Sequence, residues 1–144
     1  MKTLLIIGAI LVSQLSSAQD PEIKKAVQQF FTAFHAKDSA ALRKTFAKEI
    51  VLHSISDKNS EAKVSVEQAS VFLQSIAAIP PDMKFEEKLL SFRIDQDGLM
   101  AHVWTPYEFY INGKMSHSGV NSFSLVKEKG NWKILYCVDT RRRP

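Results

Sequence analysis

The chain has 144 residues, of which 45% are hydrophobic and 24% are charged, and its formal net charge is +4 at pH 7. This length argues against a second domain and is typical of one domain with its own core. The positive charge is mild, and its densest run, Arg141-Arg142-Arg143, lacks interleaved aromatic residues, so we expect no nucleic-acid partner. Cys137 is the single cysteine, which excludes an intramolecular disulfide and a thiolate metal cluster.

The first 18 residues have the pattern of a secretory signal peptide. Lys2 provides a positive start, residues 4–12 form an apolar run, and Ser16-Ser17-Ala18 is a small-residue cleavage site. The apolar run is too short to span a bilayer, so we expect no stable membrane anchoring. The pattern predicts cleavage near Ala18, export to the periplasm or the medium, and a single domain over residues 19–144.

Two helices are predicted at the start of this domain. Asp20 is a good N-cap and Pro21 suits the first helical position, and apolar residues then recur at helical spacing to about Ala36. Asp38 caps a second, short helix whose inward residues include Leu42 and Phe46.

A strand and a third helix follow. The run EIVLHSIS, residues 49–56, predicts a strand with His53 near its middle, and residues 57–61 predict a polar loop. Ser65 and Gln68 form a capping-box pattern that predicts a third helix starting at Ser65 and ending at Pro80-Pro81.

The second half of the chain predicts long antiparallel strands. Residues 85–94 form one strand, and residues 99–140 form a three-stranded meander with turns at Asn112-Gly113 and Lys129-Gly130. Helices gathered before strands indicate an α+β fold. We expect a strongly curved antiparallel sheet that, with about three N-terminal helices, forms a cone with an internal pocket.

The Asn112-Gly113 turn predicts the register of the first long hairpin. A two-residue loop places Glu108 opposite His117, and puts His102, Trp104 and Asn121 on the same face. Such a face, with histidines, an amide and large aromatics, suits the wall of a pocket.

The register of the last hairpin has two alternatives. A four-residue loop over residues 128–131 places Trp132, Ile134, Tyr136 and Val138 on the face of His117. A loop one residue different places Leu135, Cys137, Asp139 and Arg141 there instead.

Candidate site residues follow from this face. A carboxylate beside an imidazole fixes its tautomer and raises its basicity, so the candidate catalytic residues are His117, Glu108 and Asp139. Other residues can stack on a planar ligand, form hydrogen bonds with it or bind an anionic group. These candidate ligand-binding residues are His53, His102, Trp104, Tyr110, Asn121 and Arg141. We expect no metal and no cofactor, because the histidines lie on different strands without the spacing of a metal motif, and neither a phosphate-binding loop nor a dinucleotide fingerprint is present.

Three segments carry a resemblance to a known family: FFTAFHAKD in the first helix, IVLHSI in the first strand, and HSGVNSFSLVKEKGNWKILYCVDTRR at the end. The chain resembles the nuclear transport factor 2-like superfamily, which includes SnoaL-like polyketide cyclases, ketosteroid isomerase and scytalone dehydratase. The last segment is similar to small exported bacterial members described as putative lumazine-binding or uncharacterised. The resemblance implies a cone-shaped fold that hosts enzymes, ligand binders and interaction modules.

The leading functional prediction is an exported domain that binds a small molecule in the cone. One alternative is a cofactor-independent isomerase, dehydratase or cyclase that uses a histidine–carboxylate pair. A second alternative is an interaction module without catalysis, a homodimer formed through the sheet face that carries Val103, Tyr107, Phe109 and Val120.

Overall fold

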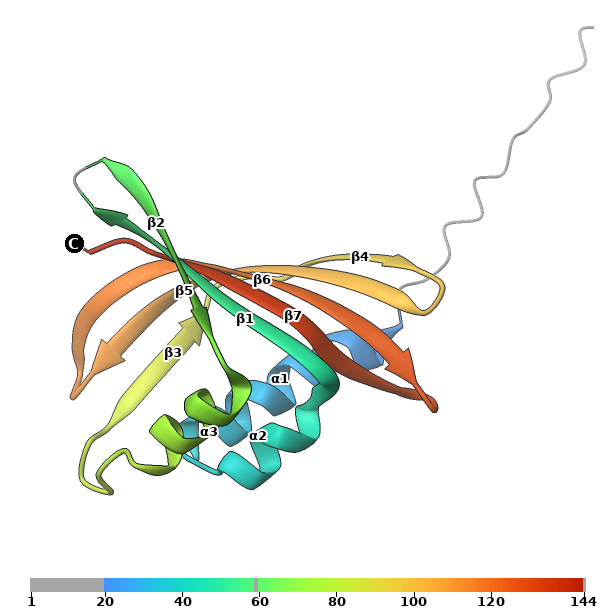
Figure 1. The fold of residues 1–144 in the computed structure, drawn as a ribbon, viewed down its shortest axis with the longest axis horizontal. Helices are drawn as coiled ribbons and strands as arrows, with labels where there is room; N and C mark the ends of the chain where they lie inside the picture. Colours follow the sequence, from blue (N-terminus) through green and yellow to red (C-terminus); the bar gives the residue numbers. More distant parts are fainter. Residues whose placement is uncertain (1–19, 59, 144) are drawn as a thin grey trace, which may run out of the picture.

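The computed structural model describes residues 20–58 and 60–143, so the predicted signal peptide lies outside the described residues. The described residues form an α+β fold, as predicted, in which three helices lie under one face of a curved, open sheet (Figure 1). The helices are α1 (Pro21–His35), α2 (Ser39–Thr45) and α3 (Ala69–Ala77). The strands are β1 (Phe46–Lys58), β2 (Glu61–Glu67), β3 (Phe85–Leu89), β4 (Arg93–Asp97), β5 (Met100–Ile111), β6 (Lys114–Glu128) and β7 (Asn131–Arg141).

The sheet is mixed, although an entirely antiparallel one was expected. Its strand order is β2-β1-β7-β6-β5-β3, with β4 also paired to β5. The first and last strands, β1 and β7, pair in parallel, whereas the other pairs of the described residues are antiparallel. This parallel pair brings the C-terminal end of the chain beside the β1–β2 hairpin (Figure 1). No helix of the described residues is long and apolar enough to cross a membrane.

The first two helices begin where their capping residues predict. The Asp20 carboxylate accepts a hydrogen bond from the backbone N–H of Glu22 at 3.0 Å, and the Asp38 carboxylate accepts one from that of Ala41 at 2.8 Å. Asp20 also accepts from Trp132 Nε1 at 2.9 Å and from Lys127 Nζ at 2.7 Å. These hydrogen bonds hold the start of α1 against the β6–β7 hairpin.

The predicted third helix starts too early. Residues 61–67 form β2, an edge strand that pairs with β1, and α3 begins only at Ala69. Val64 and Val66 alternate with polar residues, and β-branched alternation favours a strand over the capping box. The Ser65 hydroxyl donates to the Ser54 carbonyl of β1 at 3.3 Å instead of capping a helix. Phe46 likewise starts β1 rather than lying in the second helix.

The predicted strand over residues 85–94 is interrupted. Residues 85–89 pair with the end of β5, and residues 93–97 pair with its beginning, so β3 and β4 lie along the same edge of β5. Between them, the Leu90 N–H donates to the Pro106 carbonyl at 2.9 Å.

A β-bulge in the first long hairpin makes the predicted register wrong beyond the turn. The turn lies at Asn112-Gly113 as predicted, with φ of 49° and 77°. The pairing then shifts between Phe109 and Tyr110, so that Phe109 opposes His117 and Glu108 opposes Ser118. An extra residue in one strand exchanges the two faces. His117 and Asn121 therefore share the concave face with Tyr107 and Phe109.

The last hairpin contains a second β-bulge. Each of its two predicted registers is therefore correct over part of the hairpin. Near the turn Leu125 opposes Ile134, whereas beyond Leu135 Phe123 opposes Cys137 and Asn121 opposes Asp139. The concave face thus carries Trp132 and Ile134 at one end, and Cys137 and Asp139 at the other. The bulge directs Asp139 into the cone.

A phenylalanine cluster fills the part of the cone nearest the middle of α1. The Phe30 ring meets the Phe123 ring of β6 edge-on, with centroids 5.8 Å apart, and the Phe31 ring does so at 6.0 Å. Phe34 and Phe72 stack at the border of this cluster, 6.2 Å apart. Beyond them the core gives way to a cavity.

Candidate functional site

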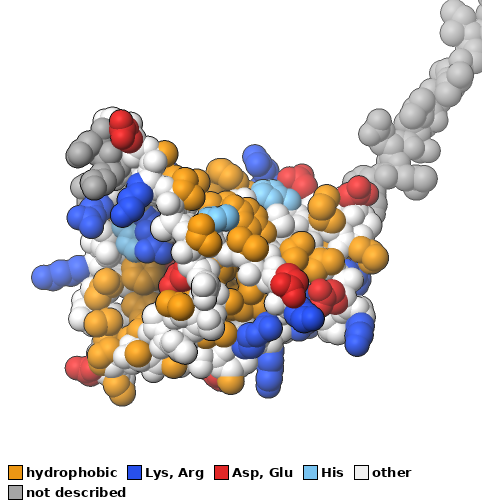
Figure 2. Space-filling view, in the orientation of Figure 1, with side chains coloured by type: hydrophobic (Ala, Val, Ile, Leu, Met, Phe, Trp, Pro, Cys, Tyr) orange, Lys and Arg blue, Asp and Glu red, His pale blue; other side chains and the backbone are white. Residues whose placement is uncertain are grey.

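The cone encloses a cavity of about 320 Å³ between the helices and the concave face of the sheet. In Figure 2, hydrophobic side chains surround a hollow on the side of the molecule where β3 lies. The apolar lining comes from α1, α3, β3 and β5 and includes Phe34, Phe72, Ile76, Phe85 and Phe109. The polar lining comes from the strands and comprises Glu67, Glu87, Tyr107, His117, Asp139 and Arg141, with Ser75 from α3.

Glu87 is the central polar residue of this cavity. Its backbone N–H donates to Nε2 of His35 at 2.9 Å, which ties β3 to the end of α1 and leaves that imidazole as an acceptor. Its carboxylate Oε1 accepts a 2.6 Å hydrogen bond from Nδ2 of Asn121. Burial, together with the charge of Asp139, raises the pKa of Glu87 to about 7 against the opposing effects of the Asn121 hydrogen bond and the Arg141 charge. Glu87 can therefore exchange a proton near neutral pH.

Tyr107, Asp139 and Arg141 form a hydrogen-bonded group beside Glu87. The Tyr107 hydroxyl lies 2.9 Å from the Thr140 carbonyl oxygen and 3.2 Å from Asp139 Oδ2. Nε of Arg141 donates to the same Asp139 oxygen at 2.8 Å. Burial, followed by the charges of Asp139 and Glu87, raises the pKa of Tyr107 well above its ordinary value, so the phenol keeps its proton.

Gly119 makes room for the Tyr107 ring. A Cβ at this position would overlap the Thr140 carbonyl oxygen and lie 2.8 Å from Cε1 of Tyr107. Glycine is required here by close packing between β5, β6 and β7.

His117 lies at the junction of the cavity and the solvent. Its ring stacks on Phe109 with centroids 4.8 Å apart and meets the edge of Tyr107 at 5.8 Å. Nδ1 lies 3.2 Å from the Ser116 hydroxyl, while Nε2 makes no hydrogen bond to the described residues. Burial, followed by the charge of Arg141, lowers the pKa of His117. The imidazole is therefore neutral at pH 7 and can offer Nε2 to a ligand.

Three of the predicted site residues line this cavity, His117, Asp139 and Arg141, and a fourth, Asn121, binds the carboxylate of Glu87. The other five occupy strand positions on the convex face of the sheet: His53, His102, Trp104, Glu108 and Tyr110. His53 also borders a neighbouring cavity of about 460 Å³. The predicted Glu108–His117 pair is wrong, because the bulge moves Glu108 opposite Ser118 and its carboxylate accepts from the Tyr110 hydroxyl at 2.8 Å.

Two more residues of the convex face have local partners. His53 Nδ1 lies 3.0 Å from the Tyr136 hydroxyl, and Trp104 is 39% exposed beneath the Arg93 guanidinium. The roles assigned to all nine residues from the sequence stay predictions.

Sequence reasoning missed Glu87 and Tyr107. The segment Phe85-Glu86-Glu87-Lys88-Leu89 does contain a signal, because Glu87 alternates with Phe85 and Leu89 on the half-buried side of β3. An acid between two inward-facing apolar residues indicates a buried carboxyl. Tyr107 was assigned to the opposite face only because the bulge was not foreseen.

Two further cavities adjoin the first. One, of about 460 Å³, lies against β1 and β2 and shares Glu67, Phe72, Asp139 and Arg141 with it. The other, of about 880 Å³, lies at the mouth of the cone and shares His117 and Arg141. The three cavities therefore lie side by side, with Arg141 in the wall of each.

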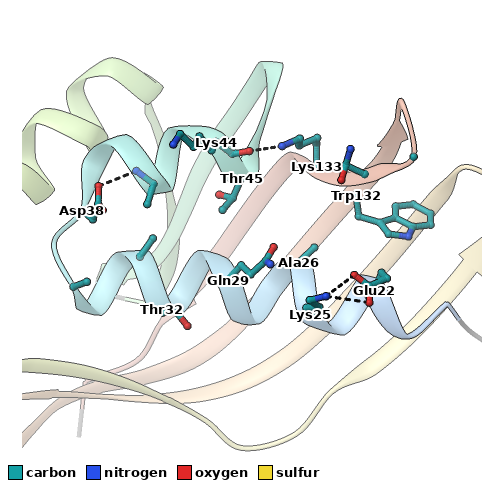
Figure 3. A pocket seen from close by; sticks show the side chains of 15 residues that line it. Glu22, Lys25, Ala26, Gln29, Thr32, Asp38, Lys44, Thr45, Trp132 and Lys133 are labelled. Carbon is teal, nitrogen blue, oxygen red and sulfur yellow. Dashed lines mark hydrogen bonds and ion pairs between the residues drawn. The ribbon is translucent and has the colours of Figure 1, made fainter.

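A groove of about 600 Å³ lies on the outside of the molecule, between α1, α2 and the start of β7 (Figure 3). Three of its charged side chains already have partners: Lys25 pairs with Glu22 at 3.0 Å, and Lys133 donates to the backbone carbonyl of Lys44. It lacks the buried titratable groups of the cone. Within the described residues, no group of three or more His, Cys, Asp and Glu side chains is placed to hold a metal ion.

Comparison with solved structures shows the same fold in several proteins. A protein of unknown function from Mycobacterium tuberculosis is 14% identical, with a TM-score of 0.67, over 85% of this chain and 71% of that one. A putative ketosteroid isomerase from Shewanella frigidimarina is 17% identical, with a TM-score of 0.61, over 83% and 95% of the two chains. A putative dehydratase of the NTF2-like family from Streptomyces avermitilis is 14% identical, with a TM-score of 0.63, over 85% and 95%.

These structural similarities establish the fold, and a family-model match establishes the family. No curated protein sequence matches the chain. The model of one protein family, described as "Putative lumazine-binding", matches residues 18–138, which include all three helices and nearly all of the sheet. The chain therefore has the NTF2-like fold and belongs to the putative lumazine-binding family.

Proposed function

We propose that this protein binds a small organic molecule inside the cone cavity. The observation that carries the proposal is an aromatic cavity into which four polar side chains converge: Glu87, Tyr107, His117 and Asp139. Its volume of about 320 Å³ falls at the lower end of the range typical of ligand sites. The family description and the fold of the comparison structures agree with such a role.

The cavity offers both apolar and polar contacts to its ligand. The Phe85 and Phe109 rings stack 5.9 Å apart, and the His117 imidazole continues that stack. A ring-containing molecule would bury its apolar surface against this wall. Because the pKa of Glu87 is about 7, its carboxyl group can either donate or accept a hydrogen bond near neutral pH.

A fluorescence titration with N-phenyl-1-naphthylamine, which brightens in apolar surroundings, tests this proposal. Ser75 is an exposed residue of α3 that lines the cavity, so Ser75→Trp places an indole across it. We expect saturable binding to the unaltered protein, at least tenfold weaker binding to Ser75→Trp, and no change in the control Lys48→Met on the outside of β1. Equal binding by all three proteins would contradict the proposal.

We propose acid–base catalysis as a second candidate function, in the class of isomerases and dehydratases. The specific observation that favours it is Glu87, a buried carboxyl whose pKa of about 7 suits proton transfer at neutral pH and which lines the cavity. This proposal replaces Glu108 with Glu87 as the candidate base, with Tyr107 and neutral His117 as neighbouring hydrogen-bonding groups.

The base-promoted ring opening of 5-nitrobenzisoxazole tests Glu87 without knowledge of the natural substrate. A base takes the proton from C3, the N–O bond breaks, and the electron pair remains on the phenolate of the nitrile product. We expect a rate that rises with pH through a midpoint at about 7 to a plateau, and that falls by about 10²-fold or more in Glu87→Gln. The matched control is Glu86→Gln, because Glu86 is the exposed neighbour on the same strand. Equal rates in both variants would exclude Glu87 as the base.

Export is proposed from the N-terminal sequence pattern. Intact-mass measurement of the protein from the periplasm and the medium should give a chain that begins at Gln19. A chain that keeps residues 1–18 would contradict cleavage.

We also propose a homodimer formed through the convex face of the sheet. The sheet face predicted from sequence cannot serve, because Val103 and Tyr107 are buried inside the cone. The convex face instead exposes Val64, Val66 and Trp104. Sedimentation equilibrium should show a dimer that Val66→Lys dissociates, and a monomer at high concentration would contradict it.

A further inference from the structure

Four cations surround the mouth of the cone: Lys63 of β2, Arg141 at the end of β7, and Arg142 and Arg143 after it. These residues, here called the basic rim, line the cavity of about 880 Å³ together with Ser56, Asp57, Ser116 and His117. Figure 2 shows Lys and Arg side chains gathered beside the hollow of the cone. The rim is therefore part of the entrance to the interior.

The rim is held in place by the backbone. The Arg142 N–H donates to the Ser118 carbonyl at 2.8 Å, and the Ser118 N–H donates to the Arg142 carbonyl at 2.9 Å. This bridge extends the pairing of β7 with β6 to Ser118, next to His117. Lys63 opposes Ser56 in the β1–β2 hairpin, on the other side of the entrance.

Most of the positive charge on the rim is not neutralised by the protein. Arg141 uses Nε to bind Asp139, and its terminal nitrogens make no hydrogen bond to the described residues. Lys63, Arg142 and Arg143 form no ion pair with any described residue.

The acids that face the rim are few and mostly engaged. One Asp57 oxygen accepts from the Ser60 N–H, and Asp139 is bound by Arg141. Glu67 lines the two inner cavities, as does Asp139, and Glu87 lies deeper in the first of them. The mouth itself is lined by the four cations and by Asp57 alone among the acids, so an anion there meets a favourable local field.

The rim cavity and the cone cavity are neighbours that share His117 and Arg141 in their walls. Arg141 lines the cone cavity, the rim cavity and the cavity against β1 and β2, and His117 lines the first two. A molecule that occupies the cone would therefore place its outer end next to the free guanidinium nitrogens of Arg141.

We propose that the ligand is an organic anion, whose apolar body occupies the cone cavity and whose carboxylate, sulfonate or phosphate group is bound by the basic rim. This inference rests on the proposed small-molecule-binding function and specifies the ligand class. Arg141 holds the anion through its terminal nitrogens while Asp139 fixes the orientation of its guanidinium, and Lys63 and Arg142 add charge from the two sides of the entrance.

A pair of fluorescent probes that differ only in one anionic group tests the inference. 8-Anilino-1-naphthalenesulfonate has the body of N-phenyl-1-naphthylamine plus a sulfonate. The test variant is Lys63→Met/Arg142→Met, which removes two rim charges but keeps the Arg141–Asp139 pair. The control variant is Lys48→Met/Lys114→Met, which removes two charges from exposed positions outside the rim.

We expect the unaltered protein to bind the sulfonate probe about tenfold more tightly than the neutral probe. The rim variant should lose about tenfold in affinity for the sulfonate and less than twofold for the neutral probe, and the control variant should change neither. Raising the salt concentration should weaken only the binding of the sulfonate.

The remaining outcomes separate the two proposals. If both probes bind equally and the rim variant changes neither, while Ser75→Trp still blocks them, the anion inference fails and the binding pocket stands. If Ser75→Trp leaves the neutral probe bound, the pocket itself is wrong. If Ser75→Trp blocks the neutral probe but not the sulfonate, the rim binds anions without the cone, which overturns the single-ligand inference.

Discussion

Asn121 and Glu87 are joined by a 2.6 Å hydrogen bond although β5 lies between their strands in the sheet. Asn121 is 5% exposed, and the carboxyl that it binds is raised to a pKa of about 7 by burial. The pair therefore places a titratable group, with one oxygen already bound, in the wall of the cone cavity beside its aromatic side chains.

The first prediction concerns stability between pH 4.5 and 7. Because the pKa of Glu87 rises from 4.5 to about 7 on folding, the folded protein holds more protons than the unfolded chain in this window. The free energy of unfolding should therefore fall as the pH rises through it, by up to about 3 kcal/mol from this group. Glu87→Gln should remove this decline and make the protein more stable than the unaltered chain at pH 8.

Urea denaturation of the two proteins at intervals from pH 4 to pH 8.5 measures this difference. Glu86→Gln provides the control, since the exposed Glu86 side chain should leave the decline in place. If the free energy of unfolding changed with pH in the same way for Glu87→Gln and the unaltered protein, burial would not raise the pKa of Glu87.

The second prediction concerns Asn121→Leu. Loss of the amide donor removes a hydrogen bond that favours the charged carboxylate, so the pKa of Glu87 should rise further above 7. At pH 8 the variant should lose about 1–3 kcal/mol of stability, because the carboxylate loses its buried partner. Carboxyl ¹³C shifts followed by NMR against pH give the pKa directly. An unchanged or lower pKa in the variant would mean that the hydrogen bond does not form in solution.

The third prediction concerns Gly119→Ala. The added Cβ would overlap the Thr140 carbonyl oxygen and press on the Tyr107 ring, so β7 must move away from β6. The cost should be about 3 kcal/mol or more in chemical denaturation, the upper range for overpacking. Ser118→Ala, at the half-buried neighbour, should cost less than about 1 kcal/mol. Similar costs for the two variants would contradict the close packing at Gly119.

The fourth prediction compares how a residue on the convex face of the sheet and a residue in the cavity affect probe binding. Trp104 is 39% exposed on the convex face, whereas Phe85 lines the cavity. Trp104→Ala should change the affinity for N-phenyl-1-naphthylamine by less than twofold. Phe85→Ala should weaken it by about tenfold, because it removes ring contacts of about 1–1.5 kcal/mol. The opposite order would restore Trp104 as a pocket residue.

Local signals in the sequence predicted much of the fold. Asp20 and Asp38 mark helix starts, and Asn112-Gly113 and Lys129-Gly130 mark turns, because each is determined by backbone chemistry within a few residues. The start of α3 was wrong because the strand propensity of Val64 and Val66, realised only through pairing with β1, outweighs the local capping pattern.

The candidate site was less predictable because it depends on two single-residue bulges. Each bulge exchanges the inward and outward residues of everything beyond it, so the first moved Glu108 and Trp104 to the convex face and brought Tyr107 inside. Nothing in the residues at the bulges distinguishes them from regular strand. The Glu87–Asn121 contact, between strands that are not neighbours, depends on the curvature of the whole sheet.

A crystal structure of the protein with bound N-phenyl-1-naphthylamine would show whether the cone cavity is the ligand site. We expect electron density for the probe in the cone, against Phe85 and Phe109 and within hydrogen-bonding reach of Glu87 or His117. Density only in the outer groove between α1, α2 and β7, or an empty cone at a concentration that saturates the fluorescence, would contradict this expectation.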